Sequence, residues 1–159
     1  MKKIIAIFVA MVGLGAAAPA FAQHINPAGA TVSMTGPASL NGQPCTLTIG
    51  VVVNASGTGG TTTAGSNTGS GICPLITIDA GATVSPVSWN ATTGVLTATA
   101  TGVNVRISGG LVCTGSITLT VKNSPPPPAT PTGSTVTISG ALGVCTVTAT
   151  LPSSLTGSM

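Results

Sequence analysis

Apolar and polar residues alternate along most of the chain beyond residue 30. The clearest run is Ile117-Thr118-Leu119-Thr120-Val121, and residues 145–151 repeat the design. Successive side chains of a strand point to opposite faces, so a period of two predicts strands with one buried and one wet face. No stretch after residue 23 has a helical period. The predicted strands are 31–34, 45–53, 75–78, 83–89, 95–101, 103–108, 111–121, 135–139 and 144–151.

These eight or nine short strands, separated by turns, predict an all-β fold, an antiparallel β-sandwich of Ig-like or Greek-key style. Two segments interrupt the pattern. Residues 54–71 are Gly, Ser and Thr with almost no apolar content, which predicts a mobile surface loop. Residues 124–131 are rich in proline, which cannot join a central strand, and predict a stiff connection within one domain.

The start of the chain has the order of a secretory signal peptide. Lys2 and Lys3 precede an apolar run over residues 4–14, and small residues follow up to Ala22. The apolar run is shorter than the ~20 residues of a membrane span. We therefore expect residues 1–22 to be removed, with cleavage between Ala22 and Gln23. Residues 23–159 then form a single exported domain with no integral membrane span.

All four cysteines lie after the signal peptide. An even number of cysteines in an exported chain predicts two disulfides and an oxidising compartment, which is the periplasm, the outer cell surface or the medium. Four cysteines allow three pairings, and the sequence does not choose between them. We prefer Cys45 with Cys73 and Cys113 with Cys145, because each pair closes a loop of about thirty residues.

Very little charge remains on the mature chain. Arg106 and Lys122 face a single acidic residue, Asp79, so the net charge is +1. Three charged side chains cannot build the basic surface that nucleic acids require, so nucleic acid is excluded as a partner. Electrostatic repulsion between copies is also weak. The composition therefore favours self-association or binding to cell surfaces and other hydrophobic interfaces.

The residues that most catalysis needs are missing from the mature chain. Asp79 is its only acidic side chain, so paired carboxylates cannot form. The turn at Gly81 gives this aspartate a structural role, and a pair with Arg106 would be structural as well. His24 stands beside the new N-terminus, where a mobile end cannot hold a general base or a metal in place. We predict a non-enzymatic protein with no cofactor and no metal site.

Trp89 is the only aromatic residue after residue 22, so we expect it to be the main anchor of the core, and a stacking platform for sugars is disfavoured. Thr-x-Thr pairs raise the question of an ice-binding ladder. The pairs begin at residues 46, 97, 118, 135 and 146, and their intervals of 51, 21, 17 and 11 are irregular. A ladder needs a constant interval, so the sequence favours ordinary outward-facing strand threonines.

Several short motifs resemble the bacterial alkane oxidation protein activators. They span most of residues 30–151 and read Cys73-Pro-Leu75, Pro86-Val-Ser-Trp89 with Thr97-Ala-Thr99, Val103-Asn-Val105 before Cys113, and Ser139-Gly-Ala-Leu-Gly-Val-Cys145-Thr-Val-Thr. The resemblance implies an exported surface or extracellular protein that assists alkane utilisation and is linked to biofilm and adhesion. It supplies no catalytic motif, and hydrocarbon contact through surface activity is a hypothesis that it adds.

A structural subunit of a pilus-like filament or an extracellular matrix is the alternative. Ala28, Ala30, Val32 and Met34 alternate with other residues, and such a segment could complete the sheet of a neighbouring copy by strand exchange. The same alternation is explained equally well by an ordinary first strand. The sequence leaves both interpretations open.

The first prediction concerns the processed N-terminus. Mass spectrometry of the exported protein should show a chain that begins at Gln23. Ala22→Phe should block processing and leave the precursor in the membrane fraction, because the cleavage site requires small residues. Ala17→Phe, which lies before that site, serves as the control. An exported chain that keeps its first 22 residues would contradict the prediction.

Overall fold

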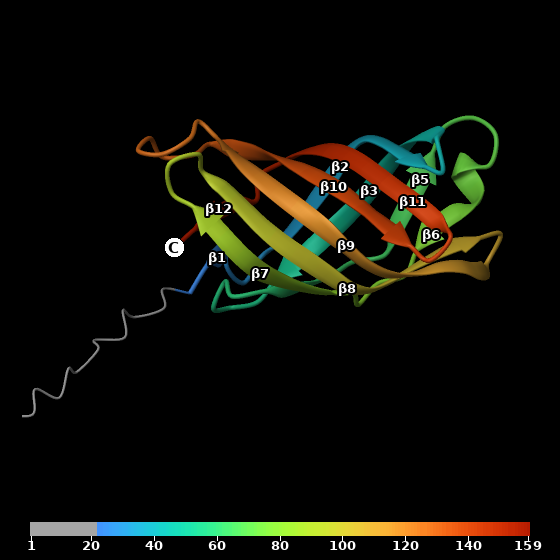
Figure 1. Cartoon of the computed structure of the whole chain (residues 1–159), viewed down its shortest axis with the longest axis horizontal. Helices are drawn as coiled ribbons and strands as arrows, with labels where there is room; N and C mark the ends of the chain where they lie inside the picture. Colours follow the sequence, from blue (N-terminus) through green and yellow to red (C-terminus); the bar gives the residue numbers. More distant parts are fainter. Residues whose placement is uncertain (1–21) are drawn as a thin grey trace, which may run out of the picture.

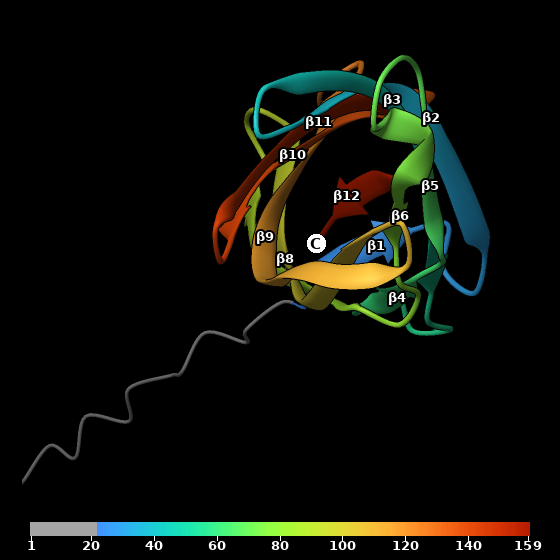
Figure 2. The same ribbon diagram turned by 90° about the vertical axis from the view of Figure 1, so that its right-hand side faces the viewer.

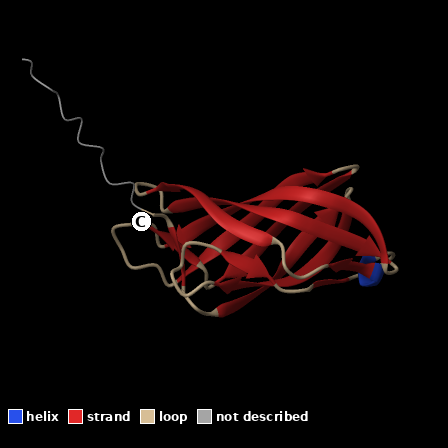
Figure 3. Ribbon diagram, turned by 90° about the horizontal axis from the view of Figure 1, so that it is seen from below, coloured by secondary structure: helices blue, strands red, loops and turns tan. Residues whose placement is uncertain are grey.

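The computed structural model describes residues 22–159, whose regular secondary structure is almost entirely strand (Figures 1 and 3). The predicted signal peptide falls almost wholly outside the described residues and stays a prediction. The strands are β1 (His24–Asn26), β2 (Thr31–Leu40), β3 (Gln43–Val53), β4 (Gly60–Thr62), β5 (Gly65–Thr68), β6 (Ile76–Ile78), β7 (Thr83–Asn90), β8 (Val95–Ile107), β9 (Gly110–Ser124), β10 (Gly133–Leu142), β11 (Cys145–Ser153) and β12 (Thr156–Ser158). A single turn of 3-10 helix, η1 (Cys73–Leu75), lies before β6.

Ten of these strands form one antiparallel sheet that closes on itself. The order is β2-β11-β10-β9-β8-β6-β5-β3-β4-β7, and additional pairings join β2 to β3 and β7 to β8. Between β3 and β8 the sheet is bridged twice, by β5 with β6 at one end and by β4 with β7 further along. Figure 2 shows the closed cross-section. Closure pairs the strands that would otherwise be edges of the sheet.

The interior of the closed sheet is aliphatic. In β11 the inward residues from Cys145 to Leu151 are buried and the threonines between them are exposed, as the period-two pattern predicted. Side chains of opposite walls pack into one cluster, which stabilises the fold through the hydrophobic effect. The largest fully buried side chains are Ile25, Met34, Leu96, Leu142, Leu151, Val51, Val53, Val105, Val136, Cys73 and Cys145.

The predicted all-β antiparallel architecture with two disulfides is confirmed. Two walls face each other across a core, as in a sandwich, but they are parts of one continuous sheet. The strands number twelve among residues 22–159, more than the eight or nine expected. The additional strands are short and lack the alternation that marks the others.

The segment 54–71 differs from the expected loop. It contains β4 and β5, which pair with opposite halves of β3. Thr62 is buried and its hydroxyl accepts a hydrogen bond from the Ala82 N–H at 3.1 Å. A Cβ at Gly65 would lie 3.1 Å from the Cβ of Ile78, so glycine lets β5 approach its neighbour closely. Backbone pairing, rather than apolar side chains, forms these strands, which is why the composition suggested a loop.

The two chain ends also lie within the fold. β1 pairs with β12 in a small two-stranded sheet, and both Ile25 and Leu155 are buried. The Nδ1 atom of His24 lies 2.9 Å from the carbonyl oxygen of Ser56. The expectation of a disordered terminus at His24 is therefore wrong for this structure, because the neighbouring Ile25 anchors the segment in the core.

A buried asparagine fastens β12 to the large sheet. Asn123 donates from Nδ2 to the Gly157 carbonyl and accepts from the Gly157 N–H, both at 2.9 Å. A Cβ at Gly157 would lie 2.8 Å from Cζ3 of Trp89, so β12 packs directly on the indole ring. Trp89 is only partly buried and packs against the edge of the core. Aliphatic side chains fill the centre where Trp89 was expected as the anchor.

Removing the Asn123 side chain tests this attachment. Asn123→Ala leaves the N–H and C=O of Gly157 buried without partners, so the free energy of unfolding should fall by about 2–4 kcal/mol in urea titrations. The neighbouring exposed residue offers a control, and Lys122→Ala should change the free energy by less than about 0.5 kcal/mol. Equal effects of the two substitutions would contradict the proposed attachment.

Candidate functional site: the apolar tip

Three hairpin turns and η1 meet at the end of the sheet that lies away from the C-terminus (Figures 1 and 3). The turns are Asn41–Gly42 between β2 and β3, Ser108–Gly109 between β8 and β9, and Gly143–Val144 between β10 and β11. Figure 2 views the molecule from this end and shows the β8–β9 hairpin crossing it. The short loops bring together segments that are far apart in the sequence.

Five exposed aliphatic side chains surround this end. Ile72 precedes η1 and Leu75 is its last residue, Leu111 and Val112 follow the β8–β9 turn, and Val144 occupies the β10–β11 turn. Their exposed fractions range from 44% for Ile72 to 85% for Val144. Single exposed aliphatic residues are common, but a group of five at one end indicates a surface that contacts another apolar phase or molecule. These five residues are called the apolar tip below.

The two disulfides lie beside the apolar tip. Cys45 is bonded to Cys73 and links β3 to η1, and Cys113 is bonded to Cys145 and links β9 to β11. These are the pairs preferred from the sequence. The backbone pairing of β9 with β10 ends at Thr118, so the part of β9 that contains Cys113 is not paired with β10. The Cys113–Cys145 disulfide connects this part of β9 to β11. The disulfides therefore fasten the segments that carry the apolar residues.

A bend in β8 places the β8–β9 hairpin across the tip. β8 pairs with β7 as far as Thr101 and with β6 from Val105 onward, and the register shifts between Thr101 and Val103. Gly102 lies between them with φ of +75°, a left-handed conformation that glycine adopts without strain. The bulge turns the distal part of the hairpin toward β6. It therefore brings Leu111 and Val112 near Leu75, whose carbonyl accepts a hydrogen bond from the Ser108 N–H at 2.9 Å.

The only ion pair among residues 22–159 holds the same hairpin. Nε of Arg106 donates to both carboxylate oxygens of Asp79, at 2.8 and 3.0 Å, and Nη1 donates to the carbonyl of Gly109 at 3.2 Å. The hydrogen bond from Arg106 is the main reason why the pKa of Asp79 lies below its ordinary value of 3.8, and the same contact raises the pKa of Arg106. Both charges are therefore used in a structural contact, as the turn position of Asp79 suggested.

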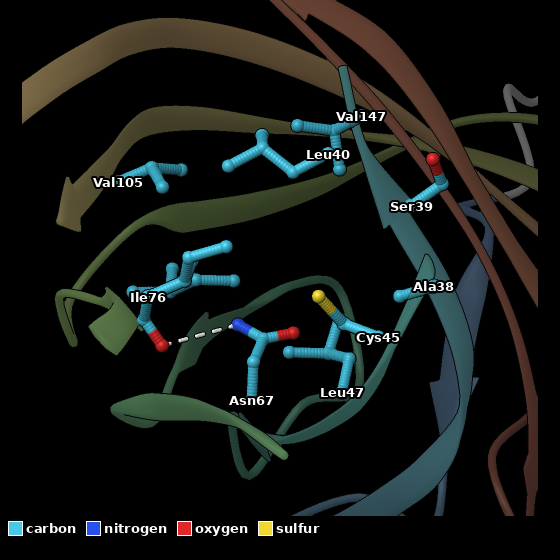
Figure 4. Close-up of a pocket in the computed structure, with 10 residues that line it drawn as sticks. Ala38, Ser39, Leu40, Cys45, Leu47, Asn67, Ile76, Val105 and Val147 are labelled. Carbon is cyan, nitrogen blue, oxygen red and sulfur yellow. Dashed lines mark hydrogen bonds between the residues drawn. The ribbon is translucent and has the colours of Figure 1, made fainter. Parts of the chain in front are cut away.

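Two small cavities lie beneath the tip. The first, of about 20 Å³, is lined mainly by aliphatic residues of β2, β3, β6, β8 and β11, with Asn67 at its side donating to the Ile76 carbonyl at 3.3 Å (Figure 4). The second, of about 30 Å³, shares Leu47, Ile78, Val105 and Val147 with the first. Ligand pockets usually measure about 300–1,000 Å³. Neither cavity is large enough to hold a ligand of ordinary size.

The described residues contain no group of three or more His, Cys, Asp or Glu side chains that could hold a metal ion. His24 lies in β1, at the opposite end from Asp79 and Arg106. None of the helical segments described is long and apolar enough to cross a membrane. The cysteines are the sequence-predicted site residues that the structure brings together, whereas Trp89 lies at the other end.

The apolar tip was not identified from the sequence. Leu111 and Val112 lie at the start of the predicted strand 111–121, and nothing in their local sequence marks both of them as exposed. Val144 carried the clearest signal, because a large aliphatic residue directly after Gly143 occupies a turn where polar residues are usual. Without the hairpin partners, however, the sequence does not show that these turns share one end.

Comparison with known families gives a match over almost the entire chain. A family model described as alkane oxidation protein activator, PraA/PraB-like, matches residues 1–158. No curated protein and no solved structure matches the chain. The two disulfides are typical of proteins in an oxidising compartment.

Acid titration tests the role of the ion pair. A carboxylate with a lowered pKa in the folded state stabilises the protein above the unfolded value near 3.8, and this contribution is lost as the pH falls through the lower folded pKa. Urea midpoints measured from about pH 7 to about pH 2 should therefore decline in acid. Asp79→Asn should lower the urea midpoint at neutral pH and flatten its decline in acid. The control Thr77→Ala should show the same decline in acid as the unchanged protein. An unchanged slope in Asp79→Asn would refute the assignment.

Proposed function

Because the chain belongs to the PraA/PraB-like family of alkane oxidation protein activators, we propose that it is an exported, non-enzymatic protein that assists alkane utilisation by adsorbing to hydrocarbon through the apolar tip. The observation that carries this proposal is the gathering of five exposed aliphatic residues at one end of a nearly uncharged chain. The mature domain, residues 23–159, acts at the outer cell surface, in the periplasm or in the medium. The same adsorption supports adhesion and biofilm formation on oil.

The size of the tip fits reversible adsorption. Moving a fully exposed Val, Leu or Ile side chain out of water contributes roughly 2 kcal/mol. Five side chains that are about half exposed then contribute about 5 kcal/mol, which corresponds to a partition coefficient of a few thousand. Weak repulsion between copies allows many molecules to crowd at one interface, because the mature chain carries only three charged side chains. Self-association at the interface follows from the same property.

The two disulfides beside the apolar tip also support the proposal. The disulfides at Cys73 and Cys145 hold residues next to the exposed aliphatic side chains. A rigid surface loses less conformational entropy when it adsorbs than a mobile one. The small cavities beneath the tip also mean that hydrocarbon is contacted by the protein surface and is not carried inside it.

The filament alternative has less support. Strand exchange requires a segment that leaves its own sheet open or unpaired. Val32 and Met34 are buried in their own domain, and β2 is paired with β3 along its whole length, from Thr31 to Leu40. The alternating residues near the N-terminus therefore serve as an ordinary first strand of the large sheet.

Measurements of oil–water interfacial tension and of depletion into hexadecane droplets test the proposal. The oxidised mature protein should lower the tension, and Leu111→Ser with Val144→Ser should weaken partitioning by about thirtyfold, since about 2 kcal/mol is removed. The matched control is Val52→Ser with Val87→Ser, which removes two exposed valines of β3 and β7 away from the tip. This control should adsorb like the unchanged protein.

Two results would overturn the proposal. If the unchanged protein neither lowers the tension nor partitions to the droplets, hydrocarbon contact is refuted. If both double variants lose adsorption equally, the tip is not the contact surface. Light scattering of each variant in buffer shows whether aggregation, rather than adsorption, accounts for depletion.

A further inference from the structure

Hydroxyl side chains form continuous rows across the outer face of the sheet. The antiparallel register places six of them side by side on six neighbouring strands from β7 to β2, and these are Ser85, Thr99, Thr118, Ser139, Thr148 and Ser39. A second row crosses five strands and consists of Ser88, Thr97, Thr120, Thr137 and Thr150. Their spacing along the sequence is irregular, so the rows arise only from strand pairing.

A hollow interrupts this face where β2, β11 and β10 lie side by side. It measures about 320 Å³ and is formed by three residues from each strand. Its outward-facing members are Pro37, Ser39, Thr137, Ser139, Thr148 and Thr150. Unlike the cavities beneath the tip, the hollow reaches the size of ordinary ligand sites, which begin near 300 Å³.

The hydroxyls of the hollow are available to a ligand. Five hydroxyl groups of the hollow make no hydrogen bond to any other residue of 22–159. They belong to Ser39, Thr137, Ser139, Thr148 and Thr150. Each hydroxyl can donate one hydrogen bond and accept others, and each threonine adds a methyl group beside its hydroxyl. The hollow therefore offers several alternating polar and apolar contacts with no net charge.

We propose that the hollow, together with the hydroxyl rows that flank it, binds a neutral polysaccharide chain. A sugar ring presents hydroxyl groups and C–H groups in alternation, which matches the chemistry of this surface. No aromatic residue lines the hollow, so each contact with a sugar is weak. A polymer with repeated units compensates for this weakness, because adjoining hydroxyls of the rows can bind neighbouring sugars of the same chain.

Other occupants fit the hollow less well. An apolar ligand would remove five hydroxyls from water without giving them hydrogen bonds, which is unfavourable. An acidic polymer finds only Lys122, which follows Thr120 by two residues on the outer face of β9. A second copy of the chain presents the same concave surface, and two concave surfaces leave a void between them.

Affinity electrophoresis through gels that contain galactomannan or hydroxyethylcellulose tests the proposal. The oxidised mature protein should be retarded by at least one of these neutral polymers. Thr137→Val with Thr150→Val removes two hydroxyls that are direct cross-strand partners, while the β-branched shape is kept. This change should weaken binding by about tenfold.

The matched control uses another exposed pair of cross-strand partners, Thr61→Val with Thr83→Val on β4 and β7. The control should bind the neutral polymers like the unchanged protein. The variant with Leu111→Ser and Val144→Ser should also bind normally, since the tip is not part of the hollow.

Four outcomes would overturn the proposal. The first two are no retardation by either neutral polymer and equal losses of binding in the two threonine variants. The third is retardation by alginate alone, which would indicate simple attraction to Lys122. The fourth is self-association that Thr137→Val with Thr150→Val abolishes, which would identify a second copy as the occupant.

Discussion

Closure of a single sheet is the constraint on which the rest of this molecule depends. The pairing of β2 with β3 and of β7 with β8 joins the ends of the strand order, so backbone hydrogen bonds encircle an aliphatic interior. A chain with three charged side chains after residue 22 has few ion pairs to position its strands. Backbone pairing and apolar burial position the strands instead, and the buried side chain of Asn123 holds β12 against the large sheet.

Closure also separates the surface into regions of different chemistry. Outward-facing positions along the walls are mostly serine and threonine, whereas the large aliphatic residues that remain exposed gather mainly where hairpins turn. The wall is wet and neutral, and the end is apolar. Such an arrangement allows two different contacts at once, because a molecule can meet oil with its end while its wall remains hydrated.

The alternation of residues predicted most of the fold. Runs such as Ile117–Val121 identified the long strands, because burial on one face leaves a direct imprint on the sequence. β4, β5 and β12 left no such imprint, since they consist of small and polar residues and form through backbone pairing. The pairings of β4 and β5 also bridge β3 to the β7 and β8 side of the closed sheet. For this reason the number of strands was underestimated. Trp89 was expected to anchor the core because it is the only aromatic residue after residue 22.

The candidate sites were harder to predict than the fold. The cysteines could be identified because their number is even and their loops are similar in length. The apolar tip and the hydroxyl rows depend on which strands are neighbours and in what register. Irregular intervals between the Thr-x-Thr pairs were therefore misleading about their arrangement in space. Threonines separated by dozens of residues in the chain, such as Thr97 and Thr120, are cross-strand partners.

The position of the chain ends has a geometric consequence. β1 and β12 pair with each other at the end of the molecule that lies furthest from the three hairpin turns (Figure 1). Any tether attached to either end, whether a fused partner, an affinity tag or a solid support, holds the molecule upright with its hairpin turns pointing outward. A coated particle would thus expose the same pole of every copy, and a layer immobilised in this way would have a uniform polarity.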